Sequence, residues 1–251
     1  MKRLILILNG KGGVGKSTFA THLVQFYKDL GAAHRSVDTD NENSTLKRFH
    51  PDAEFLDLSV PRGLDLLFEL LQQTHTVITD CRAASTDLIL GYCAEVSIFE
   101  VLESLGARLT VVIPVNHEPD SLEQLRVISS ALDNRCDYVV VRNQVHSDQF
   151  ALYDKSRIRS RLLSELRAHE ITMPKLYDWL VTGLSEHNIT VTAAIAPGKF
   201  TLIDRQRLLN WWRTLKAQME SAGPVLIPSR TGSEDGSVVE TLPSLPKEGI
   251  R

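Results

Sequence analysis

The chain has 251 residues, of which 43% are hydrophobic and 24% are charged, and its formal net charge at pH 7 is −3. This composition is sufficient for one α/β domain with an extension. The charge excludes a uniformly basic nucleic-acid-binding protein, although local basic patches remain possible. Three widely spaced cysteines predict reduced thiols and a cytoplasmic protein. No stretch approaches the roughly 18 apolar residues that span a bilayer, so we expect no membrane partner.

Short β-branched runs alternate with longer segments of helical periodicity along the chain. In chain order, the predicted strands are residues 4–8, 35–38, 76–80, 109–115, 138–141 and a short edge strand, 171–173. The predicted helices are residues 16–30, 64–71, a stretch around 88–105, 122–132, 156–169 and 202–220. This alternation is typical of βαβ units, so we expect a doubly wound α/β fold with a mostly parallel sheet and helices on both faces.

The composition changes at residue 221. Proline, glycine and serine are frequent from there to the end of the chain, and few residues could be buried. We therefore expect one domain over residues 1–220 and a disordered tail over residues 221–251.

A phosphate-binding motif follows the first predicted strand and precedes the first predicted helix. It reads Gly10-Lys11-Gly12-Gly13-Val14-Gly15-Lys16-Ser17 and matches GxxxxGK[ST]. Glycines allow the backbone N–H groups of such a loop to surround phosphate oxygens. Lys16 would reach the β- and γ-phosphates, Ser17 would bind Mg²⁺, and Thr18 would lie near the α-phosphate. The motif therefore predicts ATP and Mg²⁺ as cofactors.

Acidic and amide side chains follow three other predicted strands. Asp38 and Asp40 follow the second strand, Asp80 closes the third, and Asn143 follows the fifth. The carboxyl ends of parallel strands meet at one edge of the sheet, where ligands bind. Helix capping or turn formation explains the same residue types, so both interpretations stay open here.

Residues 11–18 resemble the deviant Walker A motif of the ParA/MinD family of ATPases. The resemblance implies an ATP-dependent homodimer in which Lys11 contacts the phosphates bound by the opposite subunit. A solvated loop lysine is the alternative. No other part of the chain matches the family as closely.

The resemblance also implies roles for the residues after the strands. Asp80 resembles the Walker B aspartate, which holds Mg²⁺, usually through water, and Asp38 resembles the switch carboxylate that orients the attacking water. Asp40 would support either of them. Asn143 resembles the asparagine that contacts adenine, because its amide can both donate and accept hydrogen bonds.

Two segments depart from the family pattern. Asn41-Glu42 stands where members often carry proline and glutamine, and residues 81–84 replace a proline-rich turn. These segments sense the γ-phosphate, so we expect ATP hydrolysis to be slow and stimulated by a partner. Residues 38–49 resemble a subgroup found with plasmid transfer genes, typified by TraL and StbB proteins.

The resemblance implies an ATP-dependent dimerisation switch in plasmid or DNA partition or positioning. The implied partners are a second copy of the chain and either non-specific DNA or a DNA-binding adaptor protein. The basic residues within 155–167 could contact DNA phosphates or form a solvated helix face.

Other functions stay open at this stage. One is an accessory ATPase of conjugative plasmid transfer that acts through a protein partner. Another is an ATP-dependent metabolic enzyme similar to dethiobiotin synthetase, although Lys11 weighs against it. The isolated cysteines argue against a third, a carrier ATPase for metal clusters.

Overall fold

The apolar runs of the chain form one parallel sheet. The computed structural model describes residues 1–60 and 62–227. Its strands are β1 (Lys2–Ile7), β2 (Arg35–Asp38), β3 (Glu54–Phe55), β4 (Thr76–Asp80), β5 (Ala107–Val115), β6 (Asp137–Asn143) and β7 (His169–Met173). Within the described part the sheet has seven strands in the order β3-β2-β4-β1-β5-β6-β7, and every pairing is parallel.

The central strand, β1, shows how side chains are divided between the two faces. Leu4 pairs with Val77 of β4 and with Leu109 of β5. Because successive side chains of a strand point to opposite faces, Leu4 and Leu6 enter one hydrophobic cluster and Ile5 enters the other. Apolar residues at consecutive positions therefore indicate a strand covered on both sides.

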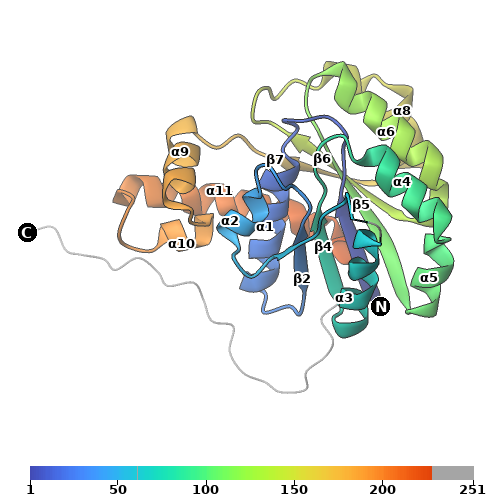
Figure 1. The fold of residues 1–251 in the computed structure, drawn as a ribbon. Coiled ribbons are helices and arrows are strands. Elements are labelled where there is room, and N and C mark those ends of the chain that lie inside the picture. The colour runs from blue at the N-terminus through green and yellow to red at the C-terminus, as the bar shows by residue number, and fades with distance from the viewer. Residues whose placement is uncertain (61, 228–251) are drawn as a thin grey trace, which may run out of the picture.

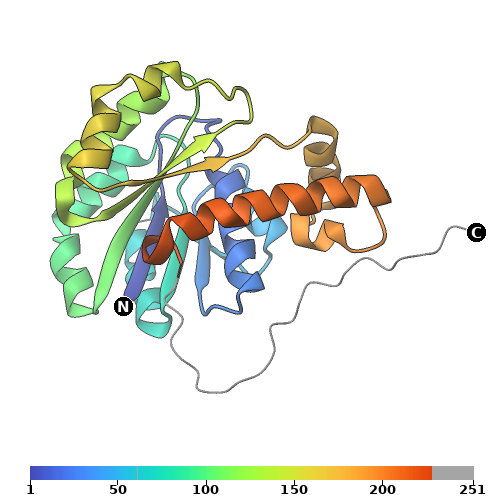
Figure 2. The same ribbon diagram turned by 180° about the vertical axis from the view of Figure 1, so that it is seen from behind.

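Helices cover both faces of the sheet (Figure 1, Figure 2). The helices are α1 (Lys16–Asp29), α2 (Thr45–Phe49), α3 (Leu66–Gln73), α4 (Thr86–Glu95), α5 (Ile98–Ser104), α6 (Pro119–Leu132), α7 (Ala151–Asp154), α8 (Arg157–Ser164), α9 (Asp178–His187), α10 (Val191–Ile195) and α11 (Leu202–Ser221). Side chains of α3 to α8 pack in one cluster, and those of α1, α2 and α9 to α11 pack in the other. The predicted doubly wound α/β fold is confirmed.

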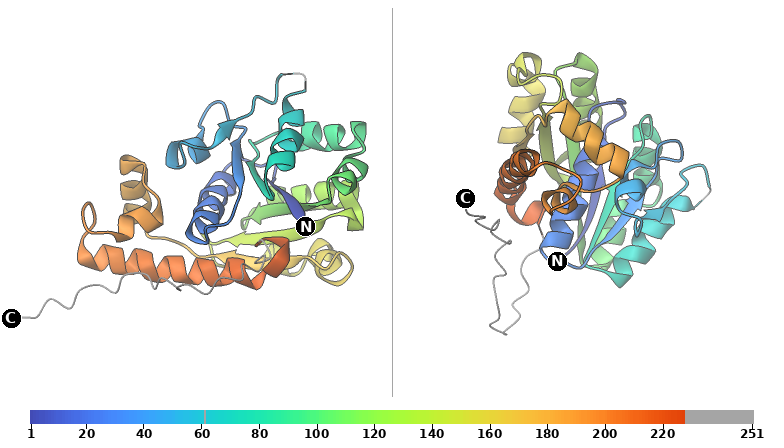
Figure 3. Two further views of the ribbon diagram at one scale, coloured as in Figure 1. Left: turned by 90° about the horizontal axis from the view of Figure 1, so that it is seen from below. Right: turned by 90° about the vertical axis from the view of Figure 1, so that its left-hand side faces the viewer.

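The last three helices form one end of the molecule. Figure 3 shows α9 and α10 beside the N-terminal part of α11, away from the strands β2 to β4. The C-terminal half of α11 crosses the face of the sheet in Figure 2, where Trp212 is buried and its Nε1 donates to Asp29 at 3.1 Å. In the described part of the chain, no helix combines the length and apolarity that crossing a membrane requires.

Two predicted helices differ from the structure by more than three residues or by a break. The stretch around 88–105 is two helices, α4 and α5, because Ser97 adopts a left-handed conformation with φ of 48° between them. The segment 156–169 is helical only to Ser164, and His169 already belongs to β7. Since α8 and β7 are joined by a short turn, the apolar spacing alone did not locate the helix end.

The short elements β3, α2, α7 and α10 were not predicted, because two to five residues contain too little periodicity to be recognised. The longer helix α9 was also missed. Trp179 and Val181 on this helix are 54% and 43% exposed, so its apolar residues do not follow one buried face.

The packed chain continues past residue 221. Leu226 is fully buried, the hydroxyl of Tyr27 donates to its carbonyl at 2.8 Å, and Thr110 donates to the carbonyl of Val225 at 2.8 Å. The domain therefore extends at least to residue 227, beyond the boundary that the composition predicted. The remainder of the predicted tail, residues 228–251, lies outside the described residues.

The burial of Leu226 leads to a test of this boundary. Leu226→Ala should lower the free energy of unfolding by about 2–5 kcal/mol, because it removes buried methyl groups and leaves a cavity. The same substitution at Leu202, which is 56% exposed, should change it by no more than about 0.5 kcal/mol. Denaturant titrations of both variants measure the difference. Equal effects would show that residue 226 contributes nothing to the packed domain.

Candidate nucleotide-binding site

The glycine loop connects β1 to α1 at the carboxyl edge of the sheet. Gly13 and Gly15 have φ angles of 76° and 94°, which side chains other than glycine rarely adopt. Gly15 is the N-cap residue of α1, and neither a side-chain cap nor an acidic residue occupies the first turn. The N–H groups at this helix end are therefore available to an anion, which the helix dipole also favours.

Lys16 lies inside the loop. Its side chain is buried, and Nζ donates to the carbonyl oxygen of Lys11 at 2.9 Å. Burial lowers the pKa of Lys16, while the nearby carboxylates of Asp80 and Asp40 act in the opposite direction. The loop thus holds a cationic group next to two acidic side chains at the end of the central strands.

Asp80 ends β4, next to the loop. It is 1% exposed, and neither carboxylate oxygen has a hydrogen-bond partner in the described part of the chain. Burial raises the pKa of Asp80 to about 7, and Ser17 and Lys16 lie close enough to oppose the rise. A buried carboxylate without partners costs stability unless a cation or a proton compensates it. These groups fit Mg²⁺, which binds oxygen ligands and keeps several waters.

Asp38 is tied to the backbone that follows it. It is fully buried, Oδ1 accepts from the N–H of Asp40 at 2.9 Å, and Oδ2 accepts from the N–H of Lys47 at 3.0 Å. Burial raises the pKa of Asp38 in spite of these hydrogen bonds. The turn and capping interpretation therefore describes its contacts here, while the switch role stays a prediction.

Asp40 forms the next turn. Its Oδ1 accepts from the N–H groups of Glu42 and Asn43 at 3.0 and 3.2 Å. Its charge contributes to the raised pKa of Asp80, so the two carboxylates belong to one electrostatic cluster. The structure thus brings together the three acidic residues that the sequence predicted at this edge.

The ammonium group of Lys11 contacts the segment that follows β5. Its Nζ lies 3.1 Å from Oδ2 of Asp120 and 3.5 Å from Oε2 of Glu118. The hydrogen bond to Asp120, with the charge of Glu118, raises the pKa of Lys11. No sequence pattern indicated these two partners, because they approach Lys11 only through the pairing of β1 with β5.

Gln124 of α6 is a second contact that the sequence did not predict. Its Oε1 accepts from the N–H of Gly10 at 3.0 Å and from the hydroxyl of Thr86 at 2.8 Å. A Cβ atom on Gly10 would lie 2.6 Å from the same oxygen, so a larger residue there would require the Gln124 amide to move. A single glutamine on an amphipathic helix forms no recognisable motif, so the sequence could not predict this contact.

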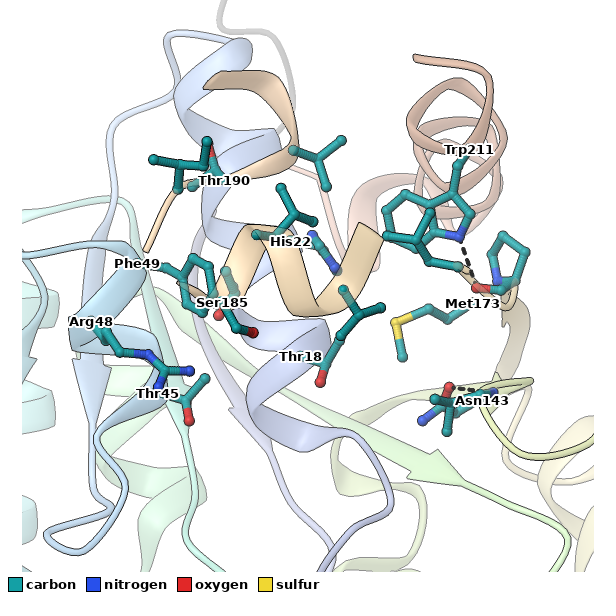
Figure 4. Close-up of a pocket in the computed structure, with 18 residues that line it drawn as sticks. Thr18, His22, Thr45, Arg48, Phe49, Asn143, Met173, Ser185, Thr190 and Trp211 are labelled. Atoms are coloured by element: carbon teal, nitrogen blue, oxygen red, sulfur yellow. Dashed lines mark hydrogen bonds between the residues drawn. The ribbon is translucent and has the colours of Figure 1, made fainter. Parts of the chain in front are cut away.

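Asn143, at the end of β6, holds the loop from the other side. It is buried, its Nδ2 donates to the carbonyl of Val14 at 2.9 Å, and its Oδ1 accepts from the N–H of Val145 at 3.1 Å. A Cβ atom on Gly15 would lie 2.3 Å from Nδ2. One N–H and one lone pair of the amide remain for a ligand. Asn143 and Thr18 line the same cavity (Figure 4).

The three cysteines lie inside the fold as free thiols. All three cysteines are buried and unpaired, and burial raises the pKa of each thiol. Within residues 1–60 and 62–227 no group of three or more His, Cys, Asp or Glu side chains could hold a metal ion. A metal ion bound to this part of the chain would therefore have fewer than three such side chains as ligands, and other groups would complete its coordination.

Two of the basic residues in the segment 155–167 form ion pairs with carboxylates. Arg159 lies 2.9 Å from Glu170, and Arg161 lies 2.8 Å from Asp133. These pairs reduce the positive charge that Arg159 and Arg161 offer to DNA phosphates. Among the ion pairs of the described residues, none involves Lys155, Arg157 or Arg167, so both interpretations of the segment stay open.

Known proteins share this sequence pattern and this fold. The CbiA family, described as CobQ/CobB/MinD/ParA nucleotide binding domain, matches residues 5–227. Protein MobD of Acidithiobacillus ferrooxidans is 24% identical over 226 residues, 87% of this chain and 97% of the relative. Protein TraL of Escherichia coli is 24% identical over 241 residues, 88% of this chain and 99% of the relative. The septum site-determining protein MinD of Pyrococcus horikoshii, complexed with Mg-ADP, is 16% identical with a TM-score of 0.51, and the match covers 90% of this chain and 99% of that one.

The buried carboxylate predicts a pH-dependent effect on stability. Asp80→Asn should stabilise the nucleotide-free chain at about pH 8. Its free energy of unfolding should rise by at most about 4 kcal/mol, and its melting temperature should rise with it. Burial raises the pKa of Asp80 to about 7, above the ordinary value of 3.8 for an aspartate, so the ionised form destabilises the folded state. This penalty begins near pH 4 and is complete above about pH 7.

The advantage of Asp80→Asn should therefore shrink as the pH falls from about 7 to about 4. Calorimetry across this range measures it. Asp148→Asn, at an exposed loop position, serves as the control and should change little at any pH. An advantage that does not vary with pH would contradict the electrostatic explanation.

Proposed function

The chain belongs to the CobQ/CobB/MinD/ParA nucleotide-binding family, and on that premise we propose that it is an ATPase whose Mg-ATP-bound form pairs with a second copy of itself. The match confirms the resemblance of the loop to the ParA/MinD type, and the match to Protein TraL agrees with the subgroup recognised in the sequence. The observation that carries the proposal is the unpaired, buried carboxylate of Asp80 beside Lys16 and Ser17 at the start of α1.

Each part of the proposed nucleotide site has a physical reason. The N–H groups of the loop and of the first turn of α1 would surround the phosphates, and Lys16 would add a buried positive charge. Ser17 and Asp80 would hold Mg²⁺, whose charge would neutralise the phosphates and the carboxylate together. The remaining N–H and lone pair of Asn143 would meet the edge of the base.

Hydrolysis would require rearrangement around Asp38. Asp38 is fully buried, and its two oxygens accept from the N–H groups of Asp40 and Lys47, so residues 40–47 would have to shift before water could reach its remaining lone pairs. An ATPase whose switch carboxylate is held in this way turns over slowly until another event moves the segment. We infer that a partner, or the second copy, supplies that event.

To contact the phosphates bound by the opposite subunit, Lys11 would also have to leave its contacts within its own chain. Asp120 and Glu118 hold its ammonium group in the single chain. These carboxylates would compete with the phosphates of the opposite subunit for the same charge. If Lys11 exchanges these two carboxylates for the nucleotide of the opposite subunit, the pairing of the two chains would depend on the γ-phosphate.

For the cellular process we propose plasmid or DNA positioning by this switch, as the resemblance implies. On α8, Arg159 and Arg161 are held in ion pairs, which leaves Arg157 as the remaining cation of this helix, so we propose contact with DNA through an adaptor protein.

The direct test separates nucleotide binding from pairing. Lys16→Ala should abolish binding of a fluorescent ATP analogue, because the buried charge that meets the phosphates is lost. Lys11→Ala should leave binding by the monomer nearly intact but abolish the dimer that forms with a non-hydrolysable ATP analogue and Mg²⁺. Fluorescence titration and light scattering measure the two properties. Equal loss of nucleotide binding in both variants would refute the trans role of Lys11.

The contact of Lys11 with Asp120 gives a further prediction. Asp120→Asn should increase ATP-dependent pairing by about two- to fivefold, because it weakens the hold on Lys11 within the chain. Glu123→Gln removes one negative charge from the same helix, where Glu123 pairs with Arg126, and should leave pairing unchanged. Sedimentation at several protein concentrations measures the dimer constants. Weaker pairing in Asp120→Asn would show that Asp120 supports the dimer instead of opposing it.

A further inference from the structure

A buried threonine lies between two of the acidic residues at the carboxyl edge of the sheet. Thr39 directly follows Asp38, the last residue of β2, and is 1% exposed. The proposed nucleotide site uses the carboxylates of Asp38 and Asp40 but not the hydroxyl group between them. A buried hydroxyl group needs partners within the fold, because it has lost its hydrogen bonds to water. Its partners therefore indicate what it holds in place.

The hydroxyl group of Thr39 donates one hydrogen bond and accepts another, and both partners follow or end β4. Oγ1 donates to the carbonyl oxygen of Asp80 at 3.0 Å and accepts from the N–H of Arg82 at 2.9 Å. The backbone N–H of Thr39 also donates to the carbonyl of Asp80, at 3.1 Å. Three hydrogen bonds of one residue thus join the end of β2 to the end of β4 and the segment after it.

The hydroxyl group acts where the backbone pairing of the two strands stops. The parallel register of β2 with β4 ends at Asp38 opposite Asp80. The next N–H along, that of Cys81, donates to β1 on the other side. Since successive N–H groups of a strand point to opposite neighbours, the N–H of Arg82 faces β2 again. There the side chain of Thr39 supplies its acceptor, which extends the contact between the two segments.

The segment 81–84 is held at its other end by the glycine loop. The N–H of Ala84 donates to the carbonyl of Gly10 at 2.9 Å, and Ala84 has a φ of 57°. This left-handed conformation is unfavourable for a residue with a Cβ atom, so it persists only while neighbouring contacts hold it. Ala83 and Ala84 are exposed. A strained segment at the surface is therefore fixed by the loop on one side and by Thr39 on the other.

Thr39 also connects this segment to the backbone that holds the first carboxylate. Asp38 and Asp40 are its neighbours in the chain, and Oδ1 of Asp38 accepts from the N–H of Asp40 at 2.9 Å. A displacement of residues 81–84 would therefore act, through Thr39, on the short stretch that carries both carboxylates. The segments after β2 and after β4 are mechanically coupled at this one side chain.

We propose that the hydroxyl group of Thr39 is a positioning group for ATP hydrolysis, a role that rests on the function proposed above. It keeps Asp38 in register with Asp80 while residues 40–47 shift, so that both carboxylates reach Mg²⁺ and the attacking water together. Thr39 itself binds neither the nucleotide nor the metal. Loss of its hydroxyl group lowers the rate of hydrolysis and leaves the affinity for nucleotide unchanged.

Two substitutions separate the hydroxyl group from the shape of the side chain. Thr39→Val should lower the hydrolysis rate at saturating Mg-ATP about tenfold, because the N–H of Arg82 loses its acceptor. Thr39→Ser keeps the hydroxyl group and should stay within about twofold of the wild-type rate. The affinity of both variants for ADP should be that of the wild type. Phosphate release and fluorescence titration with an ADP analogue measure the two properties.

Thr110→Val is the matched control. Thr110 is fully buried, its hydroxyl accepts from Arg3 at 2.6 Å and donates to the carbonyl of Val225 at 2.8 Å. It pairs with Asp137, the first residue of β6, and so lies near the amino ends of the strands. The same substitution there should lower the melting temperature but leave the rate at saturating Mg-ATP unchanged. Equal slowing by Thr110→Val and Thr39→Val would show only a general effect of lost stability.

Hydrogen exchange in the nucleotide-free chain tests the coupling without any ATPase activity. Thr39→Val should accelerate the exchange of backbone amides in both 40–47 and 81–86, whereas Thr39→Ser should not. Exchange in 137–143, on β6, should stay as in the wild type. Acceleration confined to 81–86 would overturn the proposal, because the hydroxyl group would then hold only one of the two segments.

Two kinetic outcomes would also overturn the proposal. Hydrolysis by Thr39→Val at the wild-type rate would remove the role of the hydroxyl group, and equal slowing by Thr39→Ser would assign the effect to packing. Retained ADP affinity shows that Thr39→Val is folded, and Thr39→Ala, which adds no methyl group beside Arg82, should be equally slow. A wild-type chain that binds nucleotide but hydrolyses none would refute the ATPase proposal instead, and hydrogen exchange would still decide the coupling.

Discussion

The parallel pairing of β1 with β4 on one side and β5 on the other is the constraint on which the site depends. It places the end of β4, with Asp80, and the segment after β5, with Glu118 and Asp120, on either side of the glycine loop. Lys11 therefore lies close to Glu118 and Asp120, and the charges of Asp80 and Asp40 act on Lys16. A different strand order would separate these groups, although the motif itself would be unchanged.

The loop is held by contacts that restrict its shape before any ligand arrives. Gln124 accepts from the N–H of Gly10, and Asn143 donates to the carbonyl of Val14. A Cβ atom on Gly10 or Gly15 would displace these amides, and Gly15 also has a φ of 94°, which favours glycine. A loop fixed in this way has little conformational entropy left to lose when it binds an anion.

Buried charged groups are concentrated at the same edge of the sheet. Asp80 is buried without hydrogen bonds, and Lys16 is buried beside it, so each group relies on its neighbour or on a ligand. In an ion pair such as Arg159 with Glu170, by contrast, each charge has a partner. An uncompensated carboxylate next to a helix end that can bind an anion is typical of a binding site, where a ligand completes the interactions.

The sequence by itself determined the fold class, the phosphate loop and the acidic residues at the strand ends, because these depend on local periodicity and on the glycines that a phosphate loop needs. It did not locate α9, whose exposed Trp179 and Val181 obscure the helical pattern, or the end of α8 at Ser164. Nor could it pair Lys11 with Asp120 or Gly10 with Gln124, which are more than 100 residues apart in each case. Only the tertiary structure decided those contacts and the cavity that Thr18 and Asn143 line, because side chains distant in sequence meet only when strands and helices have packed.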